Sequence, residues 1–364
     1  MSSSSRSLPS PTPESHVLAL STTLGNDALT LQCSALRYPV SDRGISLVFT
    51  HGVAGHKEQW HPVVTRLLEH HDTTKCDIRE IWSLDFPNHG ETAMLNRTIL
   101  DERKARGLKE GFVGTCTTTD YAAYLVAFLN SPHLRGRTVV GLGHSGSCTV
   151  WVHALTQFPF PHHHHHHHHH LHSLILIEPT LMFPSMSPED PRSIHGASNV
   201  RGALAKRDHW GSRQEARRWL VGNGARGVWA KRDTRVLDLF VEYAFEDVKT
   251  ANTSYTTTPT LRKDEESPLY ACLAHTIQPR QLARVCAMLN EHGKRGVHVV
   301  WAEIEEFISK TAKTDILDAA EYRVTTQRTI RGAGHAIPQE KPEALADGLE
   351  DVLQFIGRNV RAVL

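Results

Sequence analysis

The sequence lacks a long hydrophobic run. No apolar stretch in its 364 residues approaches the roughly 20 residues that a membrane-spanning helix needs. It also lacks an excess of either charge, because 40 Lys and Arg stand against 39 Asp and Glu, a formal net charge of +1. Such a balance gives no electrostatic basis for binding nucleic acid or an anionic membrane. We therefore predict a protein with no transmembrane segment and no nucleic-acid partner, and the sequence leaves its oligomeric state open.

Cysteine is scarce and shows no metal-type spacing: the six cysteines are at positions 33, 76, 116, 148, 272 and 286. The segment Met1–Glu14 is rich in Ser and Pro and has no apolar core, so we interpret it as a disordered tail rather than a secretory signal. Without such a signal, reduced thiols are expected. We predict an intracellular protein, cytoplasmic or peroxisomal, although residues 361–364 lack a peroxisomal Ser-Lys-Leu type ending.

The most informative stretch that is present runs from Thr138 to Ser147. A short β-branched run there ends in Gly143-His144-Ser145-Gly146, and a helical pattern follows from Cys148 to Gln157. The glycines allow a sharp turn from strand to helix, which would leave the Ser145 hydroxyl exposed. This is the Gly-x-Ser-x-Gly nucleophile-elbow pattern with one departure, since Ser147 occupies the place of the second glycine. Serine is small, so we interpret the change as tolerated.

A glycine-bearing loop, residues 51–56, follows another buried-strand pattern, Ile45–Thr50. Glycine lets backbone N–H groups approach a ligand closely, and the start of a helix offers further free N–H groups. We therefore assign the N–H groups of Val53 and Gly146 as the oxyanion hole, as a hypothesis.

Strand and helix patterns alternate along the chain, which predicts an α/β fold with a mostly parallel, doubly wound sheet. Residues 1–15 would form the tail, and residues 16–179 and 296–364 the two parts of the core. Residues 180–295 are too long for an ordinary crossover and contain several helical patterns, so we expect an inserted helical lid. Within the core, we interpret the charged stretch Asn96–Thr119 as a surface excursion.

Nine consecutive histidines, His162–His170, lie in a predicted loop over residues 161–172. Imidazoles could collect Zn²⁺ or Ni²⁺, but a homopolymer has no fixed geometry and cannot present a defined catalytic metal site. We favour a repeat expansion in a solvated loop. No metal site and no cofactor are therefore predicted.

A serine hydroxyl needs a base within hydrogen-bond reach, and the base needs an acid to orient it. His335 is the candidate base, because it lies on a glycine-rich loop after the last strand pattern and imidazole titrates near neutral pH. Two carboxylates compete for the third position: Glu305 follows the strand Val297–Trp301, and Glu178 ends the strand after the elbow. We predict Glu305, with Glu178 as the alternative acid, and treat Glu303 and Glu306 as bystanders.

With these pieces in place, the sequence resembles the α/β-hydrolase superfamily, and within it a fungal branch of peroxisomal lipase-like proteins and toxin-biosynthesis hydrolases. The matching segments in the core are His51-Gly52, Asp85–Thr92 with Asn96, Gly143–Ser147, Leu174–Pro179 and Gly332–His335 with Pro338. Those in the predicted lid are Lys206–Ala216 and Val236–Tyr243. The resemblance implies an α/β-hydrolase fold and a hydrolase, with Glu305 where many superfamily members carry aspartate.

The function predicted is a serine hydrolase that cleaves a small carboxylic ester, lactone or thioester through an acyl-enzyme. The resemblance suggests fungal secondary metabolism or lipid metabolism as its setting. Two alternatives stay open: an acyltransferase that uses the same three residues, and a catalytically inactive hydrolase fold that acts as a binding protein.

Overall fold

The computed structural model describes residues 12–69, 76–109, 114–158, 170–222, 228–249, 255–291 and 295–360. The strands of the main sheet are β1 (Glu14–Leu24), β2 (Asp27–Pro39), β3 (Ile45–Thr50), β4 (Ile78–Leu84), β5 (Thr138–His144), β6 (His170–Ile177), β9 (Val297–Ala302) and β10 (Thr326–Ile330). The helices of the core are η1 (Lys57–Trp60), α1 (His61–Glu69), α2 (Gly90–Lys109), α3 (Thr118–Leu129), α4 (Gly146–Gln157), α9 (Pro279–Leu289), α10 (Lys310–Ala319), α11 (Ile337–Glu340) and α12 (Pro342–Val360). No helix in these ranges is both long enough and apolar enough to cross a membrane.

The eight strands lie in the order β1-β2-β4-β3-β5-β6-β9-β10. β1 and β2 form an antiparallel hairpin, β2 pairs antiparallel with β4, and the remaining neighbours are parallel. The predicted mostly parallel α/β sheet is thus confirmed. β1 already begins at Glu14, so residues 14 and 15 belong to this hairpin and not to the predicted tail; residues 1–11 lie outside the described ranges.

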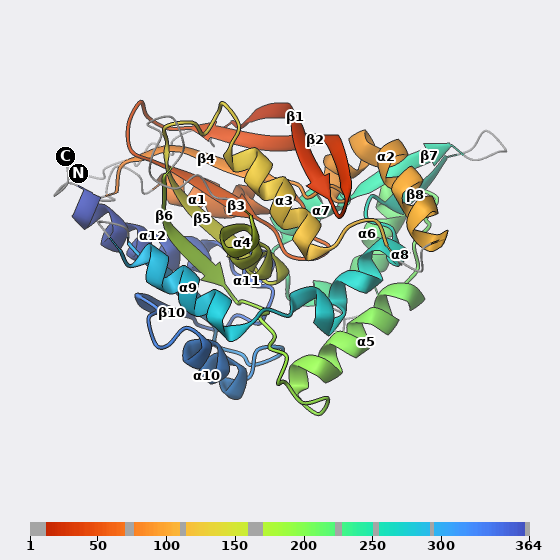
Figure 1. The fold of residues 1–364 in the computed structure, drawn as a ribbon. Coiled ribbons are helices and arrows are strands. Elements are labelled where there is room, and N and C mark those ends of the chain that lie inside the picture. The colour runs from red at the N-terminus through yellow and green to blue at the C-terminus, as the bar shows by residue number, and fades with distance from the viewer. Residues whose placement is uncertain are drawn as a thin grey trace, which may run out of the picture.

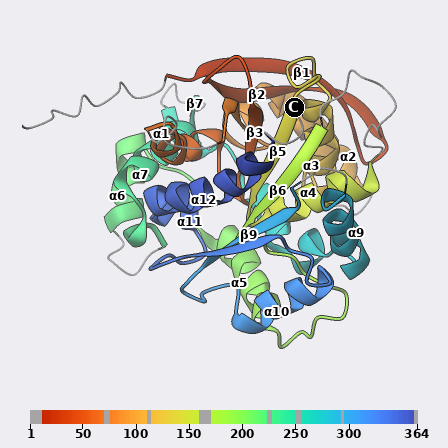
Figure 2. The ribbon, with the colours of Figure 1, turned by 90° about the vertical axis from the view of Figure 1, so that its left-hand side faces the viewer.

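Alternating side chains of the central strands fill two cores, one on each face of the sheet. In β3, Leu47 and Phe49 point to a core shared with α1 and α12, whereas Val48 points to a core shared with α3, α4 and α9. Figure 2 shows α1 and α12 on one side of the strands, and α3 and α9 on the other. Strands buried on both faces are rich in apolar residues, which is why the sequence pattern identified β3 and β9.

An inserted block separates β6 from β9 and lies at one end of the molecule, on the right in Figure 1. It contains α5 (Pro191–Ala205), α6 (Arg213–Gly222), η3 (Val228–Lys231), α7 (Thr234–Tyr243), β7 (Phe245–Lys249), β8 (Tyr255–Pro259), α8 (Lys263–Glu266), η4 (Ser267–Tyr270) and η5 (Cys272–His275). We call residues 180–278 the insertion. The predicted lid boundary at residue 295 is too late, because the next helix, α9, packs its buried Val285 and Leu289 into the core below the sheet.

Residues 96–109 are also different from the prediction, because they continue helix α2 instead of forming a surface excursion. Leu100 is fully buried in the core on this side of the sheet. Arg97 reaches from the same helix to the Thr260 carbonyl and the Glu265 carboxylate of the insertion. Part of the charge of α2 therefore serves contacts with the insertion.

A buried histidine between the last two strands gives the fold a testable pH dependence. His298 is fully buried, pairs through Nδ1 with the Thr326 hydroxyl at 2.8 Å, and has its pKa lowered to about 4 by burial. The unfolded chain binds a proton there below about pH 6.5 and the folded chain does not. The neutral His298 ring therefore contributes to the free energy of unfolding fully above pH 6.5, and this contribution is lost as the pH falls towards 4.

Between pH 7 and pH 5, the free energy of unfolding in urea should fall by up to about 2 kcal/mol less in His298→Gln than in the unmodified protein. His209→Gln is the matched control, because the His209 side chain is 64% exposed. An unchanged pH dependence in His298→Gln would contradict a neutral, buried imidazole.

Candidate active site

Ser145 stands at the sharp turn between β5 and α4, with backbone angles of φ 56° and ψ −123°. A positive φ is uncommon for a residue with a side chain and costs of the order of 1–3 kcal/mol, so surrounding contacts must hold it. The Ser145 N–H donates to the Ile177 carbonyl and the Ser145 carbonyl accepts from the Cys148 N–H, both at 3.0 Å. The turn projects the hydroxyl away from the sheet edge, as the elbow pattern predicts.

The small residues around Ser145 have separate structural reasons. A Cβ on Gly143 would lie 2.8 Å from the Trp151 ring of α4, so only glycine allows this helix to pack so closely. Ser147 is buried, and its hydroxyl accepts from the His144 N–H at 2.8 Å. The same hydroxyl lies 3.0 Å from the carbonyl oxygens of Thr50 and His144, to which it can donate. Serine at this position therefore joins β3 to the turn, a bond that glycine could not make.

Three side chains from distant parts of the sequence meet at the carboxyl edge of the sheet. The Ser145 Oγ lies 2.9 Å from the His335 Nε2, and the His335 Nδ1 lies 3.2 Å from the Glu178 Oε2. A carboxylate only accepts, so the proton is on Nδ1 and Nε2 is free to accept from the serine hydroxyl. Glu178 is buried, and its other oxygen accepts from the Ala302 N–H at 2.7 Å. The three side chains are thus hydrogen-bonded in the order serine, imidazole, carboxylate.

The structure does not place Glu305, our predicted acid, within hydrogen-bond distance of His335. After β9 the chain turns outward, and the 44% exposed Glu305 side chain accepts from the Lys310 N–H at 3.0 Å, at the start of α10. Glu306 forms an ion pair with Lys231 at 2.6 Å, and Glu303 accepts from the Gly332 N–H. The alternative acid, Glu178, occupies the position beside the imidazole that we expected for Glu305. Its backbone φ of 47° turns the chain at the end of β6 so that the carboxylate faces His335.

The N–H groups of Val53 and Gly146 lie on neighbouring segments at the serine. Val53 Cγ2 would lie 3.4 Å from a Cβ built on Gly146, and a Cβ on Gly52 would lie 3.0 Å from that of Ser145. Neither N–H donates to a protein acceptor within the described residues. Both donors are therefore available to a ligand oxygen, which keeps the oxyanion-hole assignment open as a proposal.

A buried ionic cluster fixes the loop that carries Val53. Lys57 donates from its backbone N–H to the Asp85 Oδ1 at 2.6 Å and from Nζ to the Asp85 Oδ2 at 3.1 Å. Its ammonium also pairs with Glu58 and Glu91. Burial alone would lower the pKa of Lys57, but the three carboxylates together raise it above its ordinary value. Asp85 thus orders the loop through Lys57.

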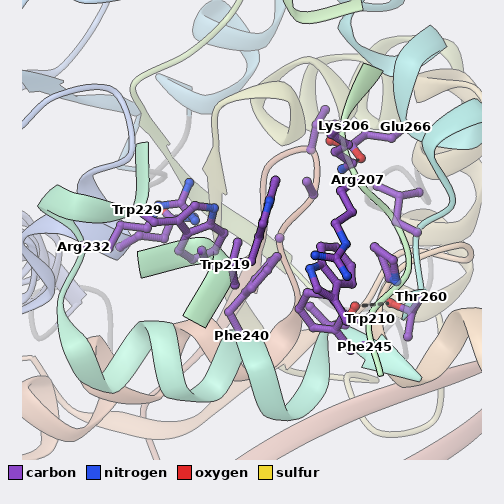
Figure 3. Close-up of a pocket in the computed structure, with 18 of the residues that line it drawn as sticks. Lys206, Arg207, Trp210, Trp219, Trp229, Arg232, Phe240, Phe245, Thr260 and Glu266 are labelled. Carbon is purple, nitrogen blue, oxygen red and sulfur yellow. Dashed lines mark hydrogen bonds and ion pairs between the residues drawn. The ribbon is translucent and has the colours of Figure 1, made fainter. Parts of the chain in front are cut away.

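Two adjoining cavities lie between the insertion and the core. The first, about 490 Å³, is lined by Ser145 and His335 from the core and by His195, Asn199 and Arg232 from the insertion. The second, about 400 Å³, is an aromatic cavity lined by Trp210, Trp219, Trp229, Phe240 and Phe245 (Figure 3). Both are lined by Val53, Lys206, Arg232, Glu266, Tyr270 and Gln339. We call them the serine cavity and the aromatic cavity.

Sequence patterns missed several residues that shape the serine cavity. The Phe307 ring lies 4.9 Å from the His335 ring, and His144 donates from Nε2 to the His335 carbonyl at 3.0 Å. Burial lowers the pKa of His144 to about 3 and that of His275 to about 4, so both rings are neutral at neutral pH. Motifs could not single them out, because 26 histidines are scattered through the sequence.

Within the described ranges, no group of three or more His, Cys, Asp or Glu side chains is arranged to hold a metal ion. Residues 162–169 of the histidine run, and with them most of the loop that we predicted over residues 161–172, lie outside those ranges. The end of that predicted loop is wrong, because residues 170–172 belong to β6. All six cysteines are free thiols.

A mostly parallel sheet with helices on both faces and a serine elbow after its central strand defines the α/β-hydrolase fold. A model of the Alpha/beta hydrolase family matches residues 47–348, and the chain belongs to that family.

Known relatives and solved structures agree with this assignment. The chain is 26% identical over 215 residues to the "Type I acyl-CoA thioesterase mpaH" of Penicillium brevicompactum, a match that covers 58% of this chain and 42% of that protein. The chain thus spans less than half the length of this relative. The fold is similar to that of the peroxisomal alpha-beta-hydrolase Lpx1 of Saccharomyces cerevisiae, with a TM-score of 0.65, 18% identity, and coverage of 95% of this chain and 90% of that one. It is also similar to a thioesterase domain from the curacin biosynthetic pathway, with a TM-score of 0.57, 11% identity, and coverage of 92% and 98%.

Proposed function

We propose that the protein is a serine hydrolase that cleaves a carboxylic ester or thioester through an acyl-enzyme. The observation that carries this proposal is the bonded order Ser145, His335, Glu178, with Ser145 Oγ 2.9 Å from His335 Nε2. A base at this distance can remove the hydroxyl proton as the oxygen attacks, and an acid on the opposite nitrogen holds the ring in the required tautomer.

The reaction proceeds in two halves. The Ser145 oxygen bonds to the substrate carbonyl carbon while its proton passes to His335 Nε2, and the N–H groups of Val53 and Gly146 stabilise the oxyanion. The bond to the leaving oxygen or sulfur then breaks, and His335 returns the proton to the leaving group. Water then gives a proton to His335 and attacks the acyl-enzyme, which releases the acid and restores the Ser145 hydroxyl. The insertion acts as a lid that limits the access of bulk water.

Thioesters are the substrates we test first, because the Penicillium relative is described as an acyl-CoA thioesterase. We expect a fluorophosphonate probe to label Ser145, and an acyl thioester to be hydrolysed with a kcat/KM at least as high as that of the matching oxygen ester. Absence of both labelling and turnover would contradict the proposal. Product analysis with added alcohols or amines distinguishes hydrolysis from acyl transfer.

We further propose an intracellular enzyme of fungal secondary or lipid metabolism. The free thiols, together with the fungal origin of the thioesterase relative, support this setting. Microscopy of the tagged protein in a fungal host tests the compartment, and an extracellular location would contradict it.

A further inference from the structure

Arg232 is a charged residue of the insertion that lines both cavities. Within the described part of the chain, its guanidinium makes no ion pair and no hydrogen bond, and its Nε is enclosed without an acceptor. The group lies over the Trp229 ring, with its central carbon 3.5 Å from the ring centroid. In Figure 3, Arg232 and Trp229 lie together at one end of the aromatic cavity. Burial lowers the pKa of Arg232 to about 10, so it is still charged at neutral pH.

The other charged side chains that line the two cavities form ion pairs or hydrogen bonds with protein groups. Lys206 pairs with Glu266, which also accepts from the Tyr270 hydroxyl at 3.1 Å. Arg207 pairs with Glu215 at 2.6 Å. Glu306 pairs with Lys231, and Glu340 accepts from the Gly334 N–H at 2.7 Å. The carboxylate of Glu340 acts on Arg232 only from a distance, without an ion pair.

A backbone hydrogen bond holds Arg232 close to the loop that carries His335. The N–H of the next residue, Asp233, donates to the Gln339 carbonyl at 2.8 Å, and Gln339 is only four residues beyond His335. Gln339 in turn donates from its side chain to Gln59 in the core at 3.1 Å. This tether fixes the part of the insertion that carries Arg232 beside the serine cavity.

An unpaired buried cation is costly, and stacking on an aromatic ring offsets only part of that cost. A carboxylate satisfies a guanidinium best, because two of its N–H groups can donate to the two oxygens. The walls beyond Arg232 are aromatic, with the Trp229 and Phe240 centroids 4.2 Å apart and those of Trp210 and Phe245 5.4 Å apart. The adjoining surfaces therefore suit a large apolar body that carries one negative group.

We propose that Arg232 binds a carboxylate on the acyl part of the substrate, whose aromatic or other bulky apolar portion fills the aromatic cavity. This inference rests on the proposed function and defines its substrate class as acid-bearing acyl esters or thioesters. The phosphates of a coenzyme A leaving group are a different source of negative charge. A coenzyme A group carries several negative charges, whereas among the described residues that line the cavities Arg232 is the one cation without an ion pair. We therefore assign Arg232 to the acyl carboxylate.

The test compares two 4-nitrophenyl esters, that of 5-phenylpentanoic acid and that of its para-carboxyphenyl analogue. For Arg232→Met, we expect the ratio of kcat/KM for the charged ester to that for the neutral ester to fall by roughly 10- to 100-fold, mainly through KM. Arg232→Lys should restore part of this ratio, because it keeps the charge but not the planar fork. Arg217→Met is the matched control: it removes a guanidinium of the insertion that pairs with Asp238 at 2.8 Å and lines neither cavity, so it should leave the ratio unchanged.

Fluorophosphonate labelling of Ser145 in each variant separates the possible failures. A labelled Arg232→Met with an unchanged ratio would overturn the proposal, because Arg232 would then only support Trp229. A second result would also overturn the proposal. This is a loss of kcat/KM in Arg232→Met that is larger for coenzyme A thioesters than for N-acetylcysteamine thioesters and does not depend on the acyl carboxylate. Absence of labelling in the unmodified protein would instead count against the serine hydrolase itself.

Discussion

Replacing Ser145 by alanine is expected to lower kcat for an ester or thioester by roughly 10⁴- to 10⁶-fold. The change removes the oxygen that lies 2.9 Å from His335 Nε2, so the proposed acyl-enzyme cannot form. Single-turnover and steady-state assays measure the loss. The melting temperature should stay close to that of the unmodified protein, because the backbone bonds that hold the turn do not involve the hydroxyl.

A neighbouring serine provides the matched control. Ser147 is two residues away and buried, but its hydroxyl bonds to the backbone of His144 and Thr50 and not to His335. We expect Ser147→Ala to lower the free energy of unfolding by about 1–3 kcal/mol and to keep kcat within tenfold of the unmodified value. If Ser147→Ala lost as much activity as Ser145→Ala, the loss could not be assigned to a nucleophile.

The second large effect distinguishes two glutamates. Glu178→Gln is expected to lower kcat by roughly 10³- to 10⁴-fold, because an amide beside His335 Nδ1 can donate a proton and so favours the wrong ring tautomer. Glutamine keeps the size of the side chain and can still accept from the Ala302 N–H, so the fold should be retained. Circular dichroism and the melting temperature check this point.

Glu305→Gln is the matched control, with the same chemical change made at the acid that the sequence favoured. The Glu305 carboxylate is exposed and accepts from the Lys310 N–H, far from any contact with the imidazole. We expect its kcat to stay within twofold of the unmodified value. The reverse pattern, with Glu305→Gln inactive and Glu178→Gln active, would require a different arrangement of the loop after β9.

Local signals were sufficient for most of the core. Ile45–Thr50 is mostly apolar because both faces of this strand are buried, and β3 has the bounds that the sequence predicted. The elbow was identifiable because its small residues are close together in the sequence: Gly143 lets α4 pack closely, and Ser147 bonds to the turn. The prediction failed for α2, whose charged residues contact the insertion, since sequence periodicity does not reveal a second charged surface nearby.

The choice between the two acids could not be made from position in the sequence. Glu178 and Glu305 both follow strands that end at the same sheet edge, and β6 and β9 are neighbours in the sheet. The difference arises from the turn that follows each strand: a positive φ at Glu178 directs its carboxylate inward, whereas the chain after Ala302 runs outward to α10. Such turns depend on packing between segments, and neither glutamate carries a local signal of it.

The sequence by itself determined the strands of the parallel core, the serine elbow and the glycine-rich loop that carries His335, because each depends on residues that are close together in the chain. The tertiary structure alone decided which glutamate meets His335, where the insertion ends, and that Arg232 faces two cavities without a partner. Those features depend on contacts between segments that lie tens to hundreds of residues apart, such as Glu178 with His335 and Asp233 with Gln339. Only folding brings these segments together, and the identity of the substrate therefore depends on the tertiary structure rather than on any motif.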